Sequence, residues 1–160
     1  VTRRRGKAKP EKPSPLEYEE LEVFVGWRAH YYLKRWKQGP GYGFNWGAFG
    51  FSAVWLPYRK MYVATLWCWS VWLVFFLSFM AAGTPQEMGG VTFIIGLVCG
   101  CKGNSWYFSH SRSALSKRPR PQGQPRDALL REIPQDGGVS FLSLAVAVVF
   151  SGFLIVVQLI

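Results

Sequence analysis

The chain has 160 residues, of which 49% are hydrophobic and 17% aromatic, and its formal net charge is +10. This length allows one domain or one small helical membrane bundle. All three cysteines (Cys68, Cys99 and Cys101) lie in apolar runs with no nearby histidine, which argues against a disulfide framework and against a metal or redox site.

Residues 1–22 form a basic, Pro-rich arm. The stretch VTRRRGKAKPEKPSPL has almost no apolar content, so we expect it to be disordered in isolation, and Glu17 to Glu22 add an acidic patch. Arg3 to Arg5 lead into Pro, Lys and Glu instead of an apolar core, so we expect no secretory signal peptide. Because the chain starts at Val1 and its last apolar run reaches Ile160, we expect processing or further residues at its ends.

Residues 23–60 are predicted to form an amphipathic helix followed by an interfacial or re-entrant segment. In VGWRAHYYLKRWKQ (25–38), apolar residues recur at helical spacing from Ala29 to Trp36, with basic residues to the sides. Such a helix suits an anionic membrane surface, and an ordinary soluble helix is the alternative. The predicted lipid-contacting residues of 23–60 are Arg28, Lys34, Arg35, Lys37, Arg59 and Lys60.

The next stretch, FNWGAFGFSAVWLPYRKMY (44–62), contains an apolar run that is too short to cross a bilayer. Asn45 is a natural N-cap for a helix that starts at Trp46, and Pro57 should break or kink that helix. If this run were a full span, Arg59 and Lys60 would emerge on the outer side with no room for a turn. It therefore lies in the inner interface or enters the membrane as a re-entrant piece.

Three transmembrane helices are predicted after it, which makes the fold class an all-α integral membrane protein. Met61 to Ala82 gives 22 residues without a charge, enough to span the hydrocarbon core. The second span begins at Gly90 and continues to about Tyr107, so that residues 61–110 form a hairpin. Residues 111–138 form a basic loop with a short helix at 126–132, and 139–160 is the third span.

The distribution of Lys and Arg predicts the orientation. Twelve precede the first span, none lies in 83–90, and seven lie between spans two and three. We therefore expect the N-terminus in the cytoplasm, the 83–90 turn outside, the 111–138 loop inside and the C-terminus outside.

Small residues repeat every four positions on two of these spans and predict close helix packing. They are Thr92, Gly96 and Gly100 on span two, and Ser143, Ala147 and Ser151 on span three. The partner is either another helix of this chain or a helix of another protein.

We find no catalytic or ligand-binding constellation in the sequence. His30 and His110 lack partners, and His110 is the better candidate only if a haem or chlorophyll is bound. No span carries a carboxylate, which argues against an ion-coupled transporter. No cofactor, metal, nucleic acid or small-molecule substrate is expected.

Several motifs resemble a family of small bacterial membrane proteins, domain of unknown function 2628. They are YYL (31–33), FNWGAF (44–49), WLPYRKMY (55–62), GN (103–104) and Tyr107, with Phe44, Asn45, Trp46, Trp55, Tyr58, Arg59 and Lys60 as the most specific. The resemblance covers about residues 25–110. It implies membrane architecture and assigns no chemistry.

We therefore expect a non-catalytic accessory subunit of a larger bacterial inner-membrane complex, with respiratory and photosynthetic hosts both open. Its partners would be other membrane subunits and anionic lipids. A stand-alone module that binds anionic lipid is the alternative, and a small transporter is less favoured.

Overall fold

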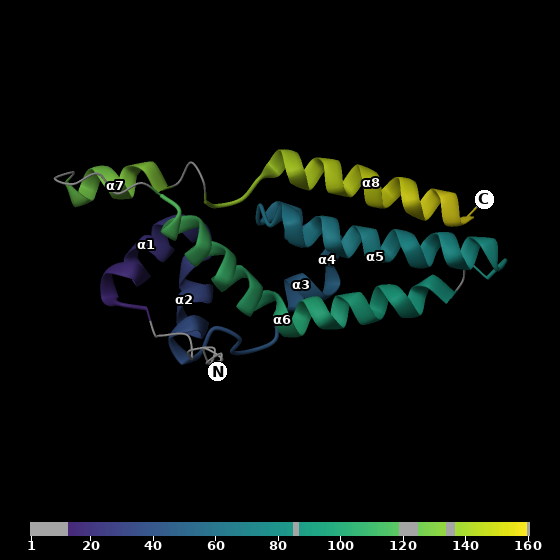
Figure 1. The fold of residues 1–160 in the computed structure, drawn as a ribbon, viewed down its shortest axis with the longest axis horizontal. Helices are drawn as coiled ribbons and strands as arrows, with labels where there is room; N and C mark the ends of the chain where they lie inside the picture. The colour runs from purple at the N-terminus through teal and green to yellow at the C-terminus, as the bar shows by residue number, and fades with distance from the viewer. Residues whose placement is uncertain (1–12, 85–86, 119–124, 134–136, 160) are drawn as a thin grey trace, which may run out of the picture.

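The computed structural model describes residues 13–84, 87–118, 125–133 and 137–159. Across these ranges the chain is all-α, with eight helices (Figure 1). In chain order they are α1 (Pro15–Val25), α2 (Ala29–Gln38), α3 (Trp46–Gly50), α4 (Ser52–Tyr58), α5 (Tyr62–Ala81), α6 (Met88–Ser116), α7 (Arg126–Glu132) and α8 (Phe141–Leu159).

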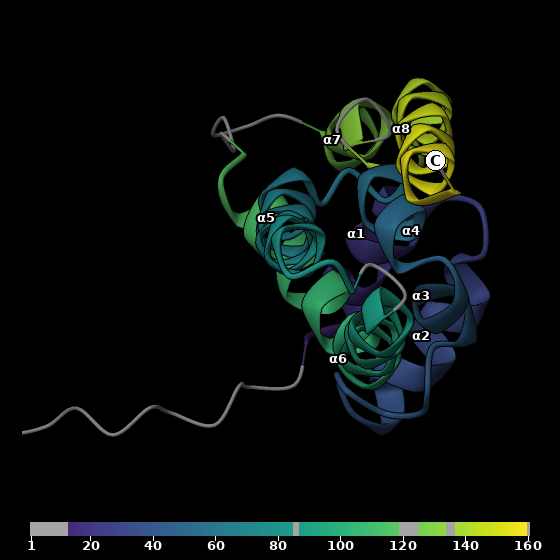
Figure 2. The same cartoon turned by 90° about the vertical axis from the view of Figure 1, so that its right-hand side faces the viewer.

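The molecule is elongated, and its two ends are built differently. Helices α5 and α8 and the first half of α6 all run along the long axis, and we call them the stem (Figure 1). Helices α1 and α2 pack on each other and on the second half of α6, and we call these three the head. Viewed along the stem, α5, α6 and α8 stand at the corners of a triangle (Figure 2).

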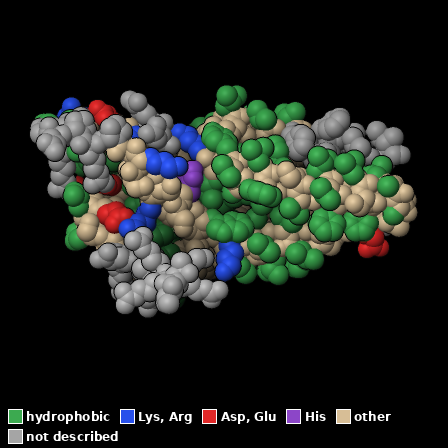
Figure 3. Space-filling model, viewed as in Figure 1, with side chains coloured by type: hydrophobic (Ala, Val, Ile, Leu, Met, Phe, Trp, Pro, Cys, Tyr) green, Lys and Arg blue, Asp and Glu red, His purple; other side chains and the backbone are tan. Residues whose placement is uncertain are grey.

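Surface chemistry follows the same division. Hydrophobic side chains cover the stem, whereas Lys, Arg and acidic side chains gather over the head (Figure 3). Large apolar side chains of α5 are widely exposed, among them Val63, Leu66, Trp67, Val74 and Leu77. A contiguous apolar surface of this kind marks contact with a membrane or with another protein.

Of the helices in the described ranges, α5 alone is both long and apolar enough to cross a membrane. It has 20 residues, and its most apolar 18-residue window has a mean hydropathy of 1.9 and is only 11% buried in the molecule. The apolar start of α6 is interrupted by Lys102 and Asn104, and the side chains beyond Gly152 in α8 lie outside the description. Of the three predicted transmembrane spans, the described residues thus support one, helix α5.

Helix α1 begins inside the predicted arm of residues 1–22. Residues 1–16 were expected to be disordered in isolation, but Pro15 and Leu16 are already helical, and the acidic patch from Glu17 to Glu22 lies on the same helix. The Ser14 side chain accepts a hydrogen bond from the backbone N–H of Glu17, and Pro15 occupies the first turn. Leu21, Phe24 and Val25 then bury one face of the helix. Residues 1–12 of the predicted arm lie outside the described residues.

The amphipathic pattern of α2 is confirmed, but its apolar face does not lie on a membrane surface. Ala29, Tyr32, Leu33 and Trp36 are all buried, as their spacing predicts. They pack inside the head, where Trp36 contacts Tyr107 and Phe108 of α6. Because protein covers this face, the ordinary amphipathic helix is the correct reading.

Residues 44–58 form a short helical hairpin. The Asn45 side chain caps α3 as predicted, accepting from the backbone N–H of Ala48 at 3.0 Å. Pro57 lies in the last turn of α4, which ends at Tyr58. Helix α3 packs on α6, and α4 packs on α8 and α5, so the hairpin lies between α6 and α8 (Figure 2).

Helix α6 continues beyond the predicted end near Tyr107 to Ser116. The added turns bury Ser111 and Leu115, which continue the face of Tyr107 and Phe108 against the head. The predicted loop at 111–138 therefore begins inside this helix. The short helix predicted at 126–132 is confirmed as α7.

Candidate functional site

Arg59 lies where the head meets the stem, between the end of α4 and the start of α5. Its exposed fraction is 2%, although the sequence predicted a side chain at the membrane surface. Lys60 adopts a left-handed conformation (φ 57°), which turns the chain between the two helices. Arg59 thus points into the protein, and its assignment as a lipid-contacting residue is wrong.

Three tyrosine rings surround the Arg59 guanidinium. Its central carbon lies 4.8 Å from the ring centre of Tyr32, 5.1 Å from that of Tyr107 and 5.6 Å from that of Tyr58. The Nη1 group donates a long hydrogen bond of 3.5 Å to the Tyr107 hydroxyl. The negative faces of the rings compensate part of the cost of burying the charge.

The electrostatics of this cluster are unusual. Among the described residues, no carboxylate pairs with Arg59, and the buried Nε–H of Arg59 has no hydrogen-bond partner. Burial raises the pKa of Tyr107 to about 12, and the nearby Arg59 charge only partly opposes that shift. Tyr107 therefore stays neutral, and its hydroxyl serves as an acceptor for the guanidinium.

A second polar cluster lies beside the first and is centred on Asn104. The Asn104 Nδ2 group donates to the backbone carbonyls of Tyr42 (3.1 Å) and Gly43 (2.8 Å). Its Oδ1 accepts from Asn45 Nδ2 at 3.0 Å, and its backbone carbonyl accepts from Trp36 Nε1 at 3.2 Å. Fully buried Asn104 therefore joins α6 to α2 through its backbone carbonyl and to the loop before α3 through its side-chain amide.

Glycines of α6 provide the surface on which α3 lies. A Cβ at Gly96 would sit 2.7 Å from the backbone oxygen of Phe49, and one at Gly100 would sit 2.3 Å from the Phe44 ring. The backbone N–H of Asn45 donates to the Gly100 carbonyl at 2.9 Å. The small-residue face predicted on span two thus receives the hairpin of this same chain.

The other predicted packing residues have different partners. Thr92 accepts a hydrogen bond from Trp72 Nε1 of α5 at 3.3 Å. Ser143 bonds to the Tyr62 hydroxyl at 3.2 Å, Ala147 is buried, and Ser151 borders a cavity in the stem. The four-residue spacing predicted which faces of α6 and α8 take part in packing, but it did not predict which residues cover those faces.

The remaining basic residues of the predicted lipid surface do not behave alike. Arg28, Lys34 and Lys37 are exposed. Arg35 is half-buried, donates to the Phe44 carbonyl at 2.9 Å and lies over the Tyr31 ring. Lys60 is half-buried as well.

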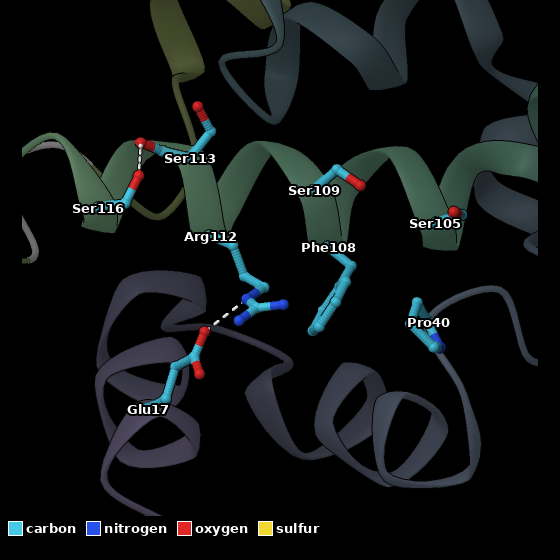
Figure 4. A pocket seen from close by; sticks show the side chains of 8 residues that line it. All are labelled: Glu17, Pro40, Ser105, Phe108, Ser109, Arg112, Ser113 and Ser116. Atoms are coloured by element: carbon cyan, nitrogen blue, oxygen red, sulfur yellow. Dashed lines mark hydrogen bonds and ion pairs between the residues drawn. The ribbon is translucent and has the colours of Figure 1, made fainter. Parts of the chain in front are cut away.

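An ion pair holds α1 to α6 at the side of the head. Arg112 of α6 reaches across to the Glu17 carboxylate of α1, next to a cavity of about 460 Å³ (Figure 4). Ser105, Ser109 and Ser113 follow the same helix beside this opening (Figure 4). Glu17 was predicted only as part of an acidic patch, although its position three residues after Ser14 is a helix-start signal.

His110, the weak cofactor candidate, is half-buried, and its ring meets the edge of Phe24 with centroids 6.4 Å apart. Burial and the nearby Lys117 charge lower its pKa, so the imidazole is neutral at pH 7. His30 is exposed on α2. Within the described ranges, no three His, Cys, Asp or Glu side chains gather as metal ligands.

A family model described as "Protein of unknown function (DUF2628)" matches residues 32–112. This range begins at Tyr32 and includes Arg59, Asn104 and Tyr107, so it contains both polar clusters. Neither the curated proteins nor the solved structures yield a match to the chain.

Proposed function

We propose that this chain, which belongs to the family described as "Protein of unknown function (DUF2628)", is a non-catalytic accessory subunit of a larger bacterial inner-membrane complex. One observation carries the proposal. Two buried polar residues in the matched range are used inside the chain: Arg59 joins the head to the start of the stem, and Asn104 joins the head to the loop that leads into the hairpin. Such an arrangement suits a rigid adaptor more than a reaction site.

In this proposal the stem crosses the membrane three times, through α5, the first half of α6 and α8. The exposed apolar side chains of α5 and the hydrophobic surface of the stem support this placement (Figure 3). The absence of Lys and Arg from 83–90, against twelve before α5, supports a cytoplasmic position for the head. The hairpin α3–α4 then enters the inner half of the membrane beside Gly96 and Gly100 as a re-entrant element.

The backbone of the hairpin supports its re-entrant placement. Backbone groups inside a membrane must be paired or covered by protein. The Asn45 N–H pairs with Gly100, and the hairpin is covered by α5, α6 and α8.

The cytoplasmic head offers a basic surface for partners. Arg28, Lys34 and Lys37 are exposed on and beside α2, and six more Lys or Arg lie in residues 1–12 by sequence. Acidic surfaces of neighbouring subunits would be attracted to such a head.

The test is purification of the native protein in mild detergent, followed by identification of subunits that co-migrate in fixed ratio. The double variant Lys34→Glu with Lys37→Glu should release the partners, while Lys34→Arg with Lys37→Arg should keep them. Both sites are exposed, so neither pair should disturb the fold. A protein that runs as an isolated monomer at every detergent concentration would contradict the proposal.

A stand-alone module that binds anionic lipid is the second candidate, favoured by the same three exposed basic residues. Purified protein added to vesicles with and without phosphatidylglycerol separates the two. If binding does not depend on the phosphatidylglycerol content, the lipid-binding module is excluded and the subunit proposal is unaffected.

A further inference from the structure

A cavity of about 510 Å³ lies in the stem beside the hairpin α3–α4. Its walls come from four helices, and they include Ser52 and Ala53 of α4, Trp69 and Trp72 of α5, and Gly89 and Ile95 of α6. Ser151 of α8 completes the lining. The hairpin lies between α6 and α8 and spans only part of their length (Figures 1 and 2).

The two indole groups of the wall are already hydrogen-bonded inside the protein. Trp69 Nε1 donates to the Ala53 carbonyl at 3.2 Å, and Trp72 Nε1 donates to the Thr92 hydroxyl at 3.3 Å. The Trp72 ring also stacks on Phe76, with centroids 5.1 Å apart. The rings are therefore fixed, and they present mainly carbon to the cavity.

Most of the wall is apolar, and its polar groups include the hydroxyls of Ser52, Ser70, Thr92 and Ser151. A buried water needs two to four polar partners, so the apolar part of the wall suits an apolar occupant better than water. The volume falls within the roughly 300–1,000 Å³ of ligand pockets, which are mostly apolar with a few polar groups. From Met88 to Ile95 the α6 wall runs for about 10 Å at the helical rise. An extended hydrocarbon chain suits this shape.

The position of the cavity indicates that this hydrocarbon chain would come from a membrane lipid. Leu66 and Leu73 belong both to its lining and to the exposed apolar surface of α5, so the cavity continues into the surface that faces the bilayer. Glu87 is exposed and directly precedes Met88 and Gly89, which line the cavity. Its carboxylate would attract a cationic amine and repel an anionic headgroup.

We propose that this cavity binds one acyl chain of an amine-bearing zwitterionic phospholipid, with the headgroup ammonium beside Glu87. The inference rests on the proposed placement of the stem in a membrane. The lipid would belong to the outer leaflet, because the turn that contains Glu87 lies on the side away from the head (Figure 1).

Two neighbouring glycines provide a matched pair of variants. A Cβ added at Gly89 or at Gly90 meets nothing within 4 Å, so both sites accept a larger residue. Gly89 lines the cavity, whereas Gly90 does not. Gly89→Leu should therefore fill the cavity, and Gly90→Leu should leave it open.

The measurement is native mass spectrometry of the full chain released from nanodiscs that contain equal phosphatidylethanolamine and phosphatidylglycerol. Wild type and Gly90→Leu should retain one phosphatidylethanolamine, and Gly89→Leu should lose it at least tenfold. Glu87→Gln should reduce the preference for phosphatidylethanolamine several-fold. Equal retention in the two glycine variants, or a second copy of the chain in place of the lipid, overturns the inference.

A second measurement uses wild type alone, in case Gly89→Leu fails to fold. A phospholipid with a photoreactive acyl chain should label residues 68–73 and 88–95, and labels confined to outward side chains such as Trp67 would overturn the inference. Alkaline carbonate extraction separates the two proposals. If the chain stays in the membrane but does not selectively retain phosphatidylethanolamine, only the cavity inference fails. If the chain is released, the proposed membrane placement of the stem fails as well.

Discussion

Arg59 is a buried positive charge. Among the described residues, aromatic rings and not a carboxylate stabilise it. Arginine suits this role better than lysine, because its flat, weakly hydrated guanidinium stacks on rings and stays charged when buried. The cluster holds α2, α4 and α6 in contact through Tyr32, Tyr58 and Tyr107. We infer that Arg59 determines how the head sits on the stem.

The raised pKa of Tyr107 gives a pH-dependent prediction. Its folded pKa of about 12 lies above the ordinary tyrosine pKa of 10.0, so its contribution to stability is complete below pH 10 and is lost as the pH rises towards 12. Wild-type stability should fall in this window with a slope of up to about 1.4 kcal/mol per pH unit beyond that of Tyr107→Phe. Thermal unfolding in detergent between pH 9 and 12 measures the difference, and parallel curves for wild type and Tyr107→Phe would contradict the assignment.

Asn104 allows a sharper test of hydrogen bonding. Asn104→Asp keeps the shape but replaces the Nδ2 donor with an acceptor that faces the Tyr42 and Gly43 carbonyls. We expect a loss of about 2–4 kcal/mol in the free energy of unfolding, because buried acceptors are left without donors. The exposed amide of Gln38 provides the control, since Gln38→Glu at the end of α2 should cost less than about 1 kcal/mol. Equal effects of the two variants would show that the Asn104 amide is not a structural hub.

At the level of elements, the contact of α3 with α6 depends on Gly96. Ala is the better helix former by about 1 kcal/mol, so Gly90→Ala should stabilise α6 slightly where its Cβ meets open space. Gly96→Ala should instead lower the unfolding temperature, because the new Cβ would press on the backbone oxygen of Phe49 at 2.7 Å, which cannot rotate away. Thermal unfolding of both variants in detergent measures this, and a gain at Gly96 would mean that α3 does not pack there.

Element types were predictable from the sequence wherever a pattern was local. The buried face of α2, the Asn45 cap and the α7 helix all follow from spacing or capping within one segment. Helix α1 was missed although Ser14, Pro15 and Glu17 carry a helix-start signal, because the preceding basic and Pro-rich residues dominated the composition.

What covers each face was not predictable from the sequence. The apolar face of α2 was assigned to lipid and the glycines of α6 to another span, yet the head and the hairpin α3–α4 cover them. Arg59 was placed on the surface because charged side chains rarely lie inside a protein. Only tertiary contacts with Tyr32 and Tyr107, which are distant in the sequence, allow its burial.

For the whole molecule, the length of α6 connects the two ends. Its 29 residues pass from the apolar stem into the head as one helix, so a movement of the head would be transmitted along α6 to the α5–α6 turn. The head, the hairpin and the stem are therefore mechanically connected through α6. This continuity suits a subunit that fixes the distance between a membrane partner and a cytoplasmic one.

The orientation of the molecule gives the last prediction. All 19 Lys and Arg lie on the head side of the predicted topology, and Glu87 lies in the opposite turn. In a chain whose three native cysteines are replaced by alanine, Glu87→Cys should react with a membrane-impermeant maleimide in cells whose inner membrane is intact. Lys117→Cys, equally exposed at the end of α6, should react only after that membrane is permeabilised. The reverse pattern would invert the topology, and labelling of both sites in intact cells would exclude a membrane between the α5–α6 turn and the head.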